Sequence, residues 1–500
     1  MKNRVVVLAS ILYSIFANAQ NGAPKDTLTI AKAKPKDTVS VYKKRVLDAA
    51  EIEFLGSYYG QNGQHSAVNG GIGTEKLTDA TSNIVLTMPI NSDDVLTVDA
   101  GFSAYTSASS SNINPFMSKN IAVSGASKMA AMRRDDDDGG GQTKAVHYGS
   151  PWITSTGASQ KDVLVSVAGS YSHSSDDRNT IVSGNASVSQ EFDYSSFGIG
   201  FGVAKLFNQK NTEVNLKANA YFDTWRAIYP TELHEYALYG ANFQNTGYFQ
   251  DVDVFDQDGN KSSSYLPSKF KEFSNEKRNS YSLSLGFSQI LTKNLQVAVF
   301  MDVLFQDGLL STPYHRMYFA DKGNYYIGET RNIPNYTSPS NKELYRLADD
   351  VERLPGTRFK LPIGARLNYY VNEKLVIRSY YRFYTDDWGL QAHTVNVELP
   401  YRISERFTLI PMYRFYTQNG VRYFAPFEKH YSFEKYYTSD YDLAPFDSHQ
   451  YGLGISYTDI LNSAKVLGFG LKNIDLRFNK YERSDQLSAG IVTLGIKFVN

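Results

Sequence analysis

Four closely spaced aspartates are the clearest sign of metal chemistry in the sequence. They are Asp251, Asp253, Asp256 and Asp258, and Gly259 follows them. Carboxylates at alternate positions before a glycine resemble a calcium-binding loop. However, Val254 occupies the position at which the D-x-D-x-D-G pattern needs its first acid. The same residues also fit a hairpin that turns at Asp258 and Gly259, so both interpretations stay open.

Residues suited to hydrolysis are scarce. The eight His residues are scattered and form no H-E-x-x-H pattern. His315 and His393 could each join a triad with a Ser and an acid, but no nucleophile motif singles out a Ser. The chain contains no Cys, which excludes disulfides, thiolate nucleophiles and Cys-based metal sites. We therefore expect no enzymatic activity and no cofactor, and a hydrolase remains only as a remote alternative.

Six basic residues have a spacing that suits anion recognition: Lys360, Arg366, Arg378, Arg382, Arg406 and Arg414. The odd positions of 359–369 are apolar or Tyr, so on a strand Lys360 and Arg366 face the other way. The same alternation turns the other four to that side, together with the acids Asp302 and Glu398. Because the guanidinium donors match carboxylate or phosphate, this face of the strands favours anionic solutes. The alternative is that the Arg residues form ion pairs with the acids and stabilise the packing of the strands.

Strands must position these side chains, because a period of two dominates the sequence. In 280–288 every odd position is bulky and apolar, and every even position is small or polar. The same pattern returns in 212–222, 295–305 and 492–498. Each such strand has one apolar and one polar face. The aromatic Phe498 near the end of the last strand also resembles the signal read by the outer-membrane insertion machinery.

The composition is typical of a membrane β-barrel. There are 37 Tyr and 29 Phe among 500 residues, yet the mean hydropathy is −0.38. Beyond the N-terminus no run of ~18 apolar residues occurs, which excludes a helical membrane protein. Tyr and Phe favour strands, and Tyr suits surfaces where an apolar region meets water. The 51 basic and 51 acidic residues leave no net charge, so we expect no nucleic-acid partner.

The lengths of the connections separate a barrel from a soluble sandwich. We expect strands near 50–59, 82–90, 95–106, 161–173, 180–191, 196–207, 212–224, 279–290, 295–306, 358–371, 375–385, 390–400, 406–417, 448–458, 466–480 and 486–499. Every long connection, namely 107–160, 225–278, 307–357 and 418–447, then falls on the same side. Transmembrane barrels show this asymmetry, with long extracellular loops and short periplasmic turns. We predict an all-β transmembrane antiparallel barrel of about 16 strands, with 14 or 18 as alternatives.

The N-terminus indicates export. Lys2 and Arg4 precede the apolar residues 5–16, and Ala17-Asn18-Ala19 forms a small-x-small cleavage pattern. We therefore predict a signal peptide over 1–19, a flexible periplasmic segment over 20–48, and a barrel over 49–500 that lies in the lipid of the cell outer membrane.

Several segments resemble a known family. They are Arg278–Ile290, Gly308–Tyr314 and Tyr381–Gly389, with the paired Ser124–Ser127 and Thr156–Ser159. These segments are similar to a family of outer-membrane proteins known mainly from Bacteroidota and catalogued as a domain of unknown function. The resemblance implies an envelope partner such as a small lipoprotein, and a conduit or scaffold role in envelope redox chemistry. It implies no catalytic or binding residues.

Two hypotheses on function therefore stand. The first is a porin-like channel or transporter for small, anionic solutes, because a barrel of about 16 strands leaves an aqueous lumen unless loops fill it. The second is a non-conducting scaffold that binds a periplasmic or surface partner through its long loops. The Tyr-rich segment 418–447 fits either an aromatic contact surface or a plug in the lumen.

Overall fold

The computed structural model describes residues 45–106, 161–246, 249–250, 252–267, 270–337, 344–462, 464–466 and 468–500. The predicted signal peptide, most of the predicted periplasmic segment and the connection 107–160 lie outside the described residues, as does Asp251. The described helices include none that is long and apolar enough to cross a bilayer.

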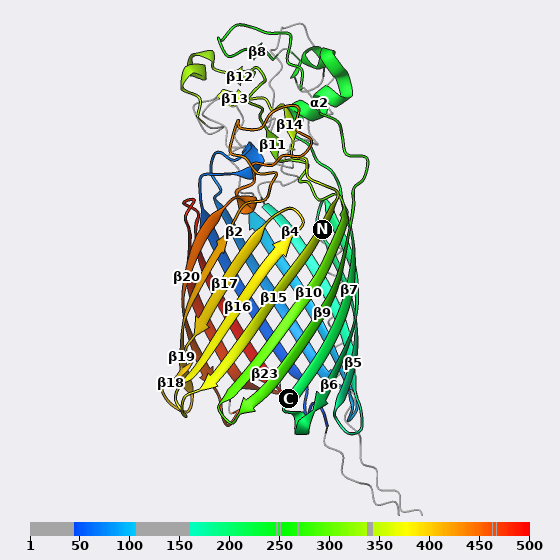
Figure 1. Ribbon diagram of the computed structural model, residues 1–500, viewed down its shortest axis with the longest axis vertical. Helices are drawn as coiled ribbons and strands as arrows, with labels where there is room; N and C mark the ends of the chain where they lie inside the picture. The colour runs from blue at the N-terminus through cyan, green and yellow to red at the C-terminus, as the bar shows by residue number, and fades with distance from the viewer. Residues whose placement is uncertain are drawn as a thin grey trace, which may run out of the picture. The chain divides into compact units, whose positions relative to one another are not determined.

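Sixteen antiparallel strands form the barrel (Figure 1). Their bounds are β1 (Glu51–Asn62), β2 (Leu77–Pro89), β3 (Asp94–Thr106), β4 (Lys161–Ser174), β5 (Thr180–Gln190), β6 (Tyr194–Phe207), β7 (Thr212–Trp225), β9 (Lys277–Thr292), β10 (Leu295–Gly308), β15 (Thr357–Tyr370), β16 (Val376–Asp386), β17 (Gln391–Glu398), β19 (Phe407–Gln418), β20 (Phe446–Thr458), β22 (Phe469–Arg483) and β23 (Ser488–Val499). The short strands β18 (Tyr401–Arg402) and β21 (Lys465–Val466) extend the sheet at two turns.

The barrel closes between its first and last strands. β1 pairs with β2 on one side and with β23 on the other, in a register that runs from Glu51 opposite Val499 to Asn62 opposite Ser488. Closure leaves no unpaired sheet edge, as a bilayer requires. The predicted fold class and the count of 16 strands are confirmed.

The two faces of the wall differ as the alternation predicts. On β9 the side chains of Tyr281, Leu283, Leu285 and Phe287 are 40–46% exposed on the outer surface. The intervening positions, such as Ser282 and Ser284, face inward. Leu283 lies opposite Ala218 of β7 and Val303 of β10, so the apolar outer face continues across neighbouring strands. An apolar belt of this extent suits contact with lipid.

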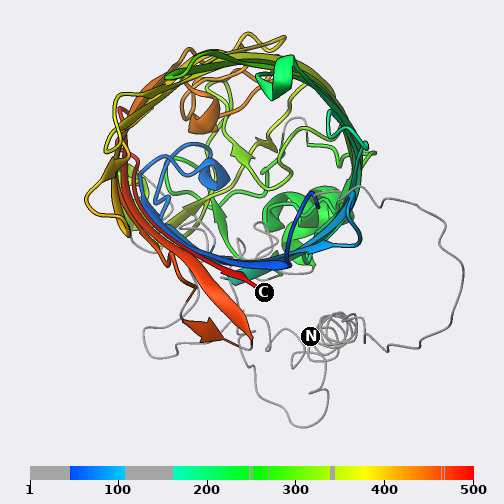
Figure 2. The same ribbon diagram turned by 90° about the horizontal axis from the view of Figure 1, so that it is seen from below.

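The loops at one end of the barrel fold into a cap, which we define as residues 63–76, 226–276, 309–356 and 419–445 (Figure 1). Its elements are η1 (Ala67–Asn69), α2 (Thr231–Tyr239), η5 (Gly240–Asn245), β8 (Val254–Phe255), β11 (Arg316–Met317), β12 (Tyr326–Gly328), η7 (Thr330–Asn335), β13 (Leu344–Arg346), β14 (Asp350–Val351) and η8 (Tyr441–Leu443). Seen along the barrel axis, cap segments project across the opening (Figure 2).

The cap has apolar cores of its own. One cluster gathers Phe243, Phe249, Tyr265, Ile327 and Tyr345, and these residues come from two different connections. The small sheet β8–β12–β13 joins the same two connections through backbone hydrogen bonds. The described parts of 226–276 and 309–356 therefore pack together.

Candidate functional site

A cavity of about 970 Å³ lies between the cap and the inner wall of the barrel. Its wall side includes aromatic residues of the strands, and its cap side includes Val68, Tyr314 and His315. Five acids line it: Glu75, Glu191, Asp193, Asp440 and Asp442. Three cations also line it: Arg278, Arg414 and Arg483. This volume and mixture of aromatic and charged groups suit a small polar ligand.

Burial changes the charge of two of these acids. Burial raises the pKa of Glu191 to about 7, and the neighbouring Asp193 carboxylate adds to the shift. Burial likewise raises the pKa of Glu75, which accepts a hydrogen bond from the backbone N–H of His65 at 3.0 Å. Near neutral pH the cavity therefore carries less negative charge than its count of acids implies.

The register places five of the six predicted basic residues on the inner face of the wall. Lys360 and Arg366 of β15 lie opposite Asp386 and Tyr380 of β16. The inner face of β16 also carries Arg378 and Arg382, and that of β19 carries Arg414. Arg414 lines the cavity, which fixes the inward direction of this set.

The direction of Arg406 stays a prediction. Arg406 is exposed in the turn that precedes β19, where the backbone N–H groups of Arg406 and Phe407 both donate to Ser404 Oγ. Because β19 begins at Phe407, the strand register that orients the other five residues does not include Arg406.

The inward arginines divide into two classes. Arg378 lies 3.9 Å from Glu398, and Arg477 lies 3.4 Å from the same carboxylate. Arg366, by contrast, lies 5.6 Å from the ring centroids of both Phe300 and Tyr380. Within the part of the chain that the structure describes, Arg366, Arg382 and Arg414 have no carboxylate within ion-pair distance. Part of the set braces the wall, and part presents unpaired positive charge to the lumen.

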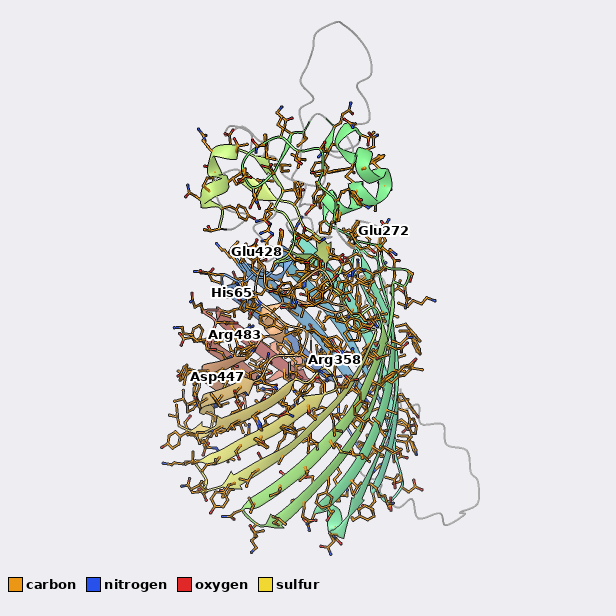
Figure 3. The ribbon with its side chains drawn as sticks, turned by 45° about the horizontal axis from the view of Figure 1, so that its top comes forward. His65, Glu272, Arg358, Glu428, Asp447 and Arg483 are labelled. Carbon is orange, nitrogen blue, oxygen red and sulfur yellow. The ribbon has the colours of Figure 1, made fainter. Side chains whose placement is uncertain are left out.

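Two arginines that the sequence reasoning missed lie at the end of the wall nearest the cap (Figure 3). Arg358 pairs with Asp386 at 2.5 Å, with its guanidinium 4.2 Å from the Trp388 ring centroid. Arg483 lies 2.5 Å from both Asp442 and Asp485. Both face inward by the same alternation that indicated Lys360, so extending that pattern over more strands would have found them.

The aspartate-rich segment forms the hairpin rather than a converging set of ligands. The backbone N–H groups of Asp258 and Asn260 each donate to Asp256 Oδ1 at 2.9 Å, while Phe255 and Lys261 pair across the turn. Asp253 lies 2.7 Å from Lys261 Nζ. The carboxylates of Asp253 and Asp256 are thus turned to separate partners, and Asp251 lies outside the described residues.

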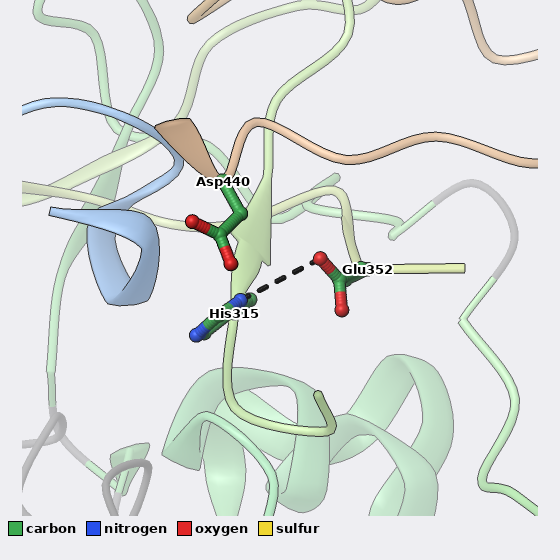
Figure 4. Close-up of side chains that lie close together, drawn as sticks. All are labelled: His315, Glu352 and Asp440. Atoms are coloured by element: carbon green, nitrogen blue, oxygen red, sulfur yellow. Dashed lines mark ion pairs between the residues drawn. The ribbon is translucent and has the colours of Figure 1, made fainter. Parts of the chain in front are cut away.

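The cap also brings together three side chains that the sequence reasoning did not group: His315, Glu352 and Asp440 (Figure 4). The β11–β14 pairing places Arg316 opposite Val351, so the adjacent His315 and Glu352 become neighbours. Their Nδ1 and Oε2 atoms lie 3.6 Å apart. Asp440 comes from a different connection and precedes η8, where its Oδ1 accepts a hydrogen bond from Asp442 N. One ligand atom from each residue lies within 4.8 Å of the other two.

These three groups affect one another's charge. Burial raises the pKa of Asp440 to about 7, and the Asp442 carboxylate acts in the same direction. Burial opposes the charged form of His315, but Glu352 outweighs this effect and raises the pKa of the imidazole. Only His315 was singled out from the sequence, because its two acidic neighbours are distant in the chain.

His393 lies on the outer face of β17, where Tyr381 Oη is 2.9 Å from its Nδ1.

Buried charge also connects the cap segments. Arg316 donates to Glu232 Oε1 at 2.9 Å, and both side chains are 0% exposed. A further nitrogen of Arg316 lies 3.4 Å from the carbonyl oxygen of Val68. One guanidinium thereby connects the segments 63–76, 226–276 and 309–356.

Comparison with known proteins shows one family. A family model described as "Protein of unknown function (DUF3570)" matches residues 27–492. A search of curated protein sequences found no match. Among solved structures, a bacterial polysaccharide outer membrane secretin aligns with a TM-score of 0.39 and 9% identity, over 91% of this chain and 99% of its own.

Two further solved structures are outer-membrane proteins from pseudomonads. The outer membrane protein opdK from Pseudomonas aeruginosa aligns with a TM-score of 0.35 and 8% identity, over 91% of this chain and 99% of its own. A BenF-like porin from Pseudomonas fluorescens Pf-5 aligns with a TM-score of 0.36 and 8% identity, over 90% of this chain and 98% of its own. The likeness is one of barrel architecture and carries no information about a solute.

Proposed function

Since the chain belongs to the family described as "Protein of unknown function (DUF3570)", which names no activity, we propose a function from the geometry. We propose that the protein is an outer-membrane, porin-like channel for small anionic solutes, and that its cap closes the outer mouth. A barrel of 16 strands encloses a lumen wide enough for solutes when its loops do not fill it.

The observation that carries the proposal is the unpaired positive charge on the inner wall. Arg366 lies on β15, Arg382 on β16 and Arg414 on β19, and β17 pairs with both β16 and β19. None of the three has a carboxylate in ion-pair range among the described residues. Cationic side chains that line a pore favour anions, and the guanidinium group suits carboxylate or phosphate in particular. Arg378 differs from these three, because it shares the Glu398 carboxylate with Arg477.

The test is ion selectivity in planar bilayers, using a form of the barrel without residues 419–445. The β19–β20 ladder runs to Gln418 opposite Phe446, so an Asn-Gly turn can join the two strands at that point. We expect this channel to prefer chloride over potassium, as read from the reversal potential in a salt gradient. The combined change R366Q, R382Q and R414Q should abolish the preference.

A control variant removes a positive charge that lies outside the lumen. Arg331, on the cap surface with a side chain 79% exposed, pairs only loosely with Glu329 at 3.6 Å. R331Q should leave the selectivity unchanged. Cation preference in the unaltered channel, or an unchanged preference in the triple variant, would refute the anion proposal.

A scaffold function remains the second candidate, because one observation favours it. Tyr431 and Phe433 of the cap stack with ring centroids 5.4 Å apart, yet their exposed fractions are 46% and 77%. Exposed aromatic pairs are typical of protein contact surfaces. Under this proposal the pair binds another envelope protein, such as a small lipoprotein, and the barrel conducts no ions even when the cap is shortened.

A further inference from the structure

The group formed by His315, Glu352 and Asp440 has the composition of a metal site. It combines one imidazole with two carboxylates, and each offers one ligand atom within 4.8 Å of the others. Zn²⁺ and related first-row divalent ions accept such a mixture of nitrogen and oxygen ligands. Ca²⁺ is a poorer match, because it takes six to eight oxygen ligands.

The spacing is close to what a bound ion needs. Bonds of about 2.0–2.2 Å in tetrahedral geometry place ligand atoms about 3.4 Å apart. The Nδ1 of His315 and the Oε2 of Glu352 are already 3.6 Å apart. Asp440 brings a carboxylate oxygen within 4.8 Å of both atoms.

An unsatisfied atom gives independent support. Nδ1 of His315 is buried, and its ion pair with Glu352 Oε2 at 3.6 Å is too long for a hydrogen bond, so the nitrogen makes none among the described residues. A buried polar atom without a partner is costly and is rare in folded proteins. A bound cation would satisfy this nitrogen through its lone pair.

The surrounding contacts orient the two acids as metal sites require. Glu352 is 2% exposed, accepts a hydrogen bond from the backbone N–H of Thr312 at 2.7 Å, and accepts another from Thr438 Oγ1 at 2.5 Å. Asp440 is held by the backbone N–H of Asp442. Such outer contacts fix the direction of a ligand's lone pairs. Both His315 and Asp440 line the cavity, which gives an ion and a coordinating water a route to the site.

We propose that His315, Glu352 and Asp440 bind a divalent first-row transition-metal ion such as Zn²⁺. The ion would connect the segment 309–356, which supplies two ligands, to the segment 419–445, which supplies the third. It therefore adds a removable link between two parts of the cap that face the same cavity.

The direct test uses the full-length protein, purified in detergent without a polyhistidine tag and stripped of metal with a chelator. Titration with Co²⁺ is followed by visible absorption, and Zn²⁺ affinity is measured by competition with a chromophoric chelator. We expect binding of one ion per chain with a ligand-field band of low coordination number. H315A and D440N should each weaken binding about tenfold or more.

The surface pair of His234 and Glu272 provides a matched control, since its ligand atoms lie 3.7 Å apart on the exposed side of the cap. H234A should bind Co²⁺ as the unaltered protein does. If H315A fails to fold, D440N decides the question, because it keeps the size of the side chain. The proposal is overturned if the unaltered protein binds no Co²⁺, which is the result expected if His315 is protonated and held between the two carboxylates. It is also overturned if D440N binds Co²⁺ as well as the unaltered protein does.

Discussion

At the scale of single residues, the charge of the cavity depends on which acids keep their protons. Glu191 lies in the turn between β5 and β6, and Asp193, Tyr314 and Arg278 line the cavity with it. Burial and the neighbouring Asp193 raise its pKa to about 7. A carboxyl group with a raised pKa stays neutral at mildly acidic pH and ionises as the pH rises through that value.

We therefore predict that Glu191 is protonated at about pH 6 and ionised at about pH 8. Difference infrared spectra of the unaltered protein and E191Q should isolate its protonated carboxyl band, which should fade over that interval. A Glu191 band that is already absent at pH 6 would contradict the prediction.

Residue types alone could predict part of the candidate site. The alternation around Lys360 indicates an inward row of arginines, because strand geometry fixes the direction of each side chain. It cannot indicate which arginines are paired, because Glu398 of β17 meets Arg477 of β22 across strands that do not pair with each other. Nor can it join His315 to Glu352 and Asp440, which are brought together by the pairing of short cap strands.

At the scale of elements, the strands follow from the sequence more fully than the loops do. The pattern of β9 predicts its faces, because the outward positions 281–287 are bulky and apolar, and it predicts the bounds to within two residues at each end. The ends of β1 and β2 extend beyond their expected limits, to Asn62 and from Leu77, because polar residues at this end of the barrel hide the alternation. The cap elements are too short for any periodic pattern to indicate them.

The cap depends on the buried ion pair of Arg316 and Glu232. We predict that E232Q loosens the cap by about 3–5 kcal/mol, because it leaves a buried guanidinium without its counter-ion. Hydrogen exchange should then rise in 226–276 and 309–356, while the barrel strands keep their protection. E329Q, which alters an exposed pair, should leave the exchange unchanged. Equal protection in E232Q would show that the pair does not hold the cap.

The junction of β10 with the cap depends on Gly308. Its φ is +111°, and a Cβ atom at this position would meet the carbonyl oxygen of Lys277. We predict that G308A destabilises this end of the β9–β10 hairpin by at least ~1–3 kcal/mol, the usual cost of such backbone strain. Thermal unfolding followed by electrophoretic mobility would measure it. G169A, where a Cβ meets no atom within 4 Å, should have little effect, and an equal loss in both variants would contradict the prediction.

At the scale of the whole molecule, the wall and the cap have separate roles. The wall is a closed sheet whose outer face is apolar and whose inner face carries arginines. The cap packs on its own apolar clusters and encloses a cavity with the wall. Because the wall and the cap have different apolar contacts, we expect that each can be altered without unfolding the other, so that the function of each can be tested separately.

The most direct test compares single-channel conductance in planar bilayers before and after residues 419–445 are replaced by an Asn-Gly turn. We predict that the full-length protein shows little or no conductance, and that the shortened protein forms an open, anion-selective pore. Heat-dependent electrophoretic mobility shows whether the shortened barrel is folded, so that a lack of conductance cannot be due to unfolding. A shortened barrel that is folded yet conducts no ions would contradict the channel proposal and favour the scaffold.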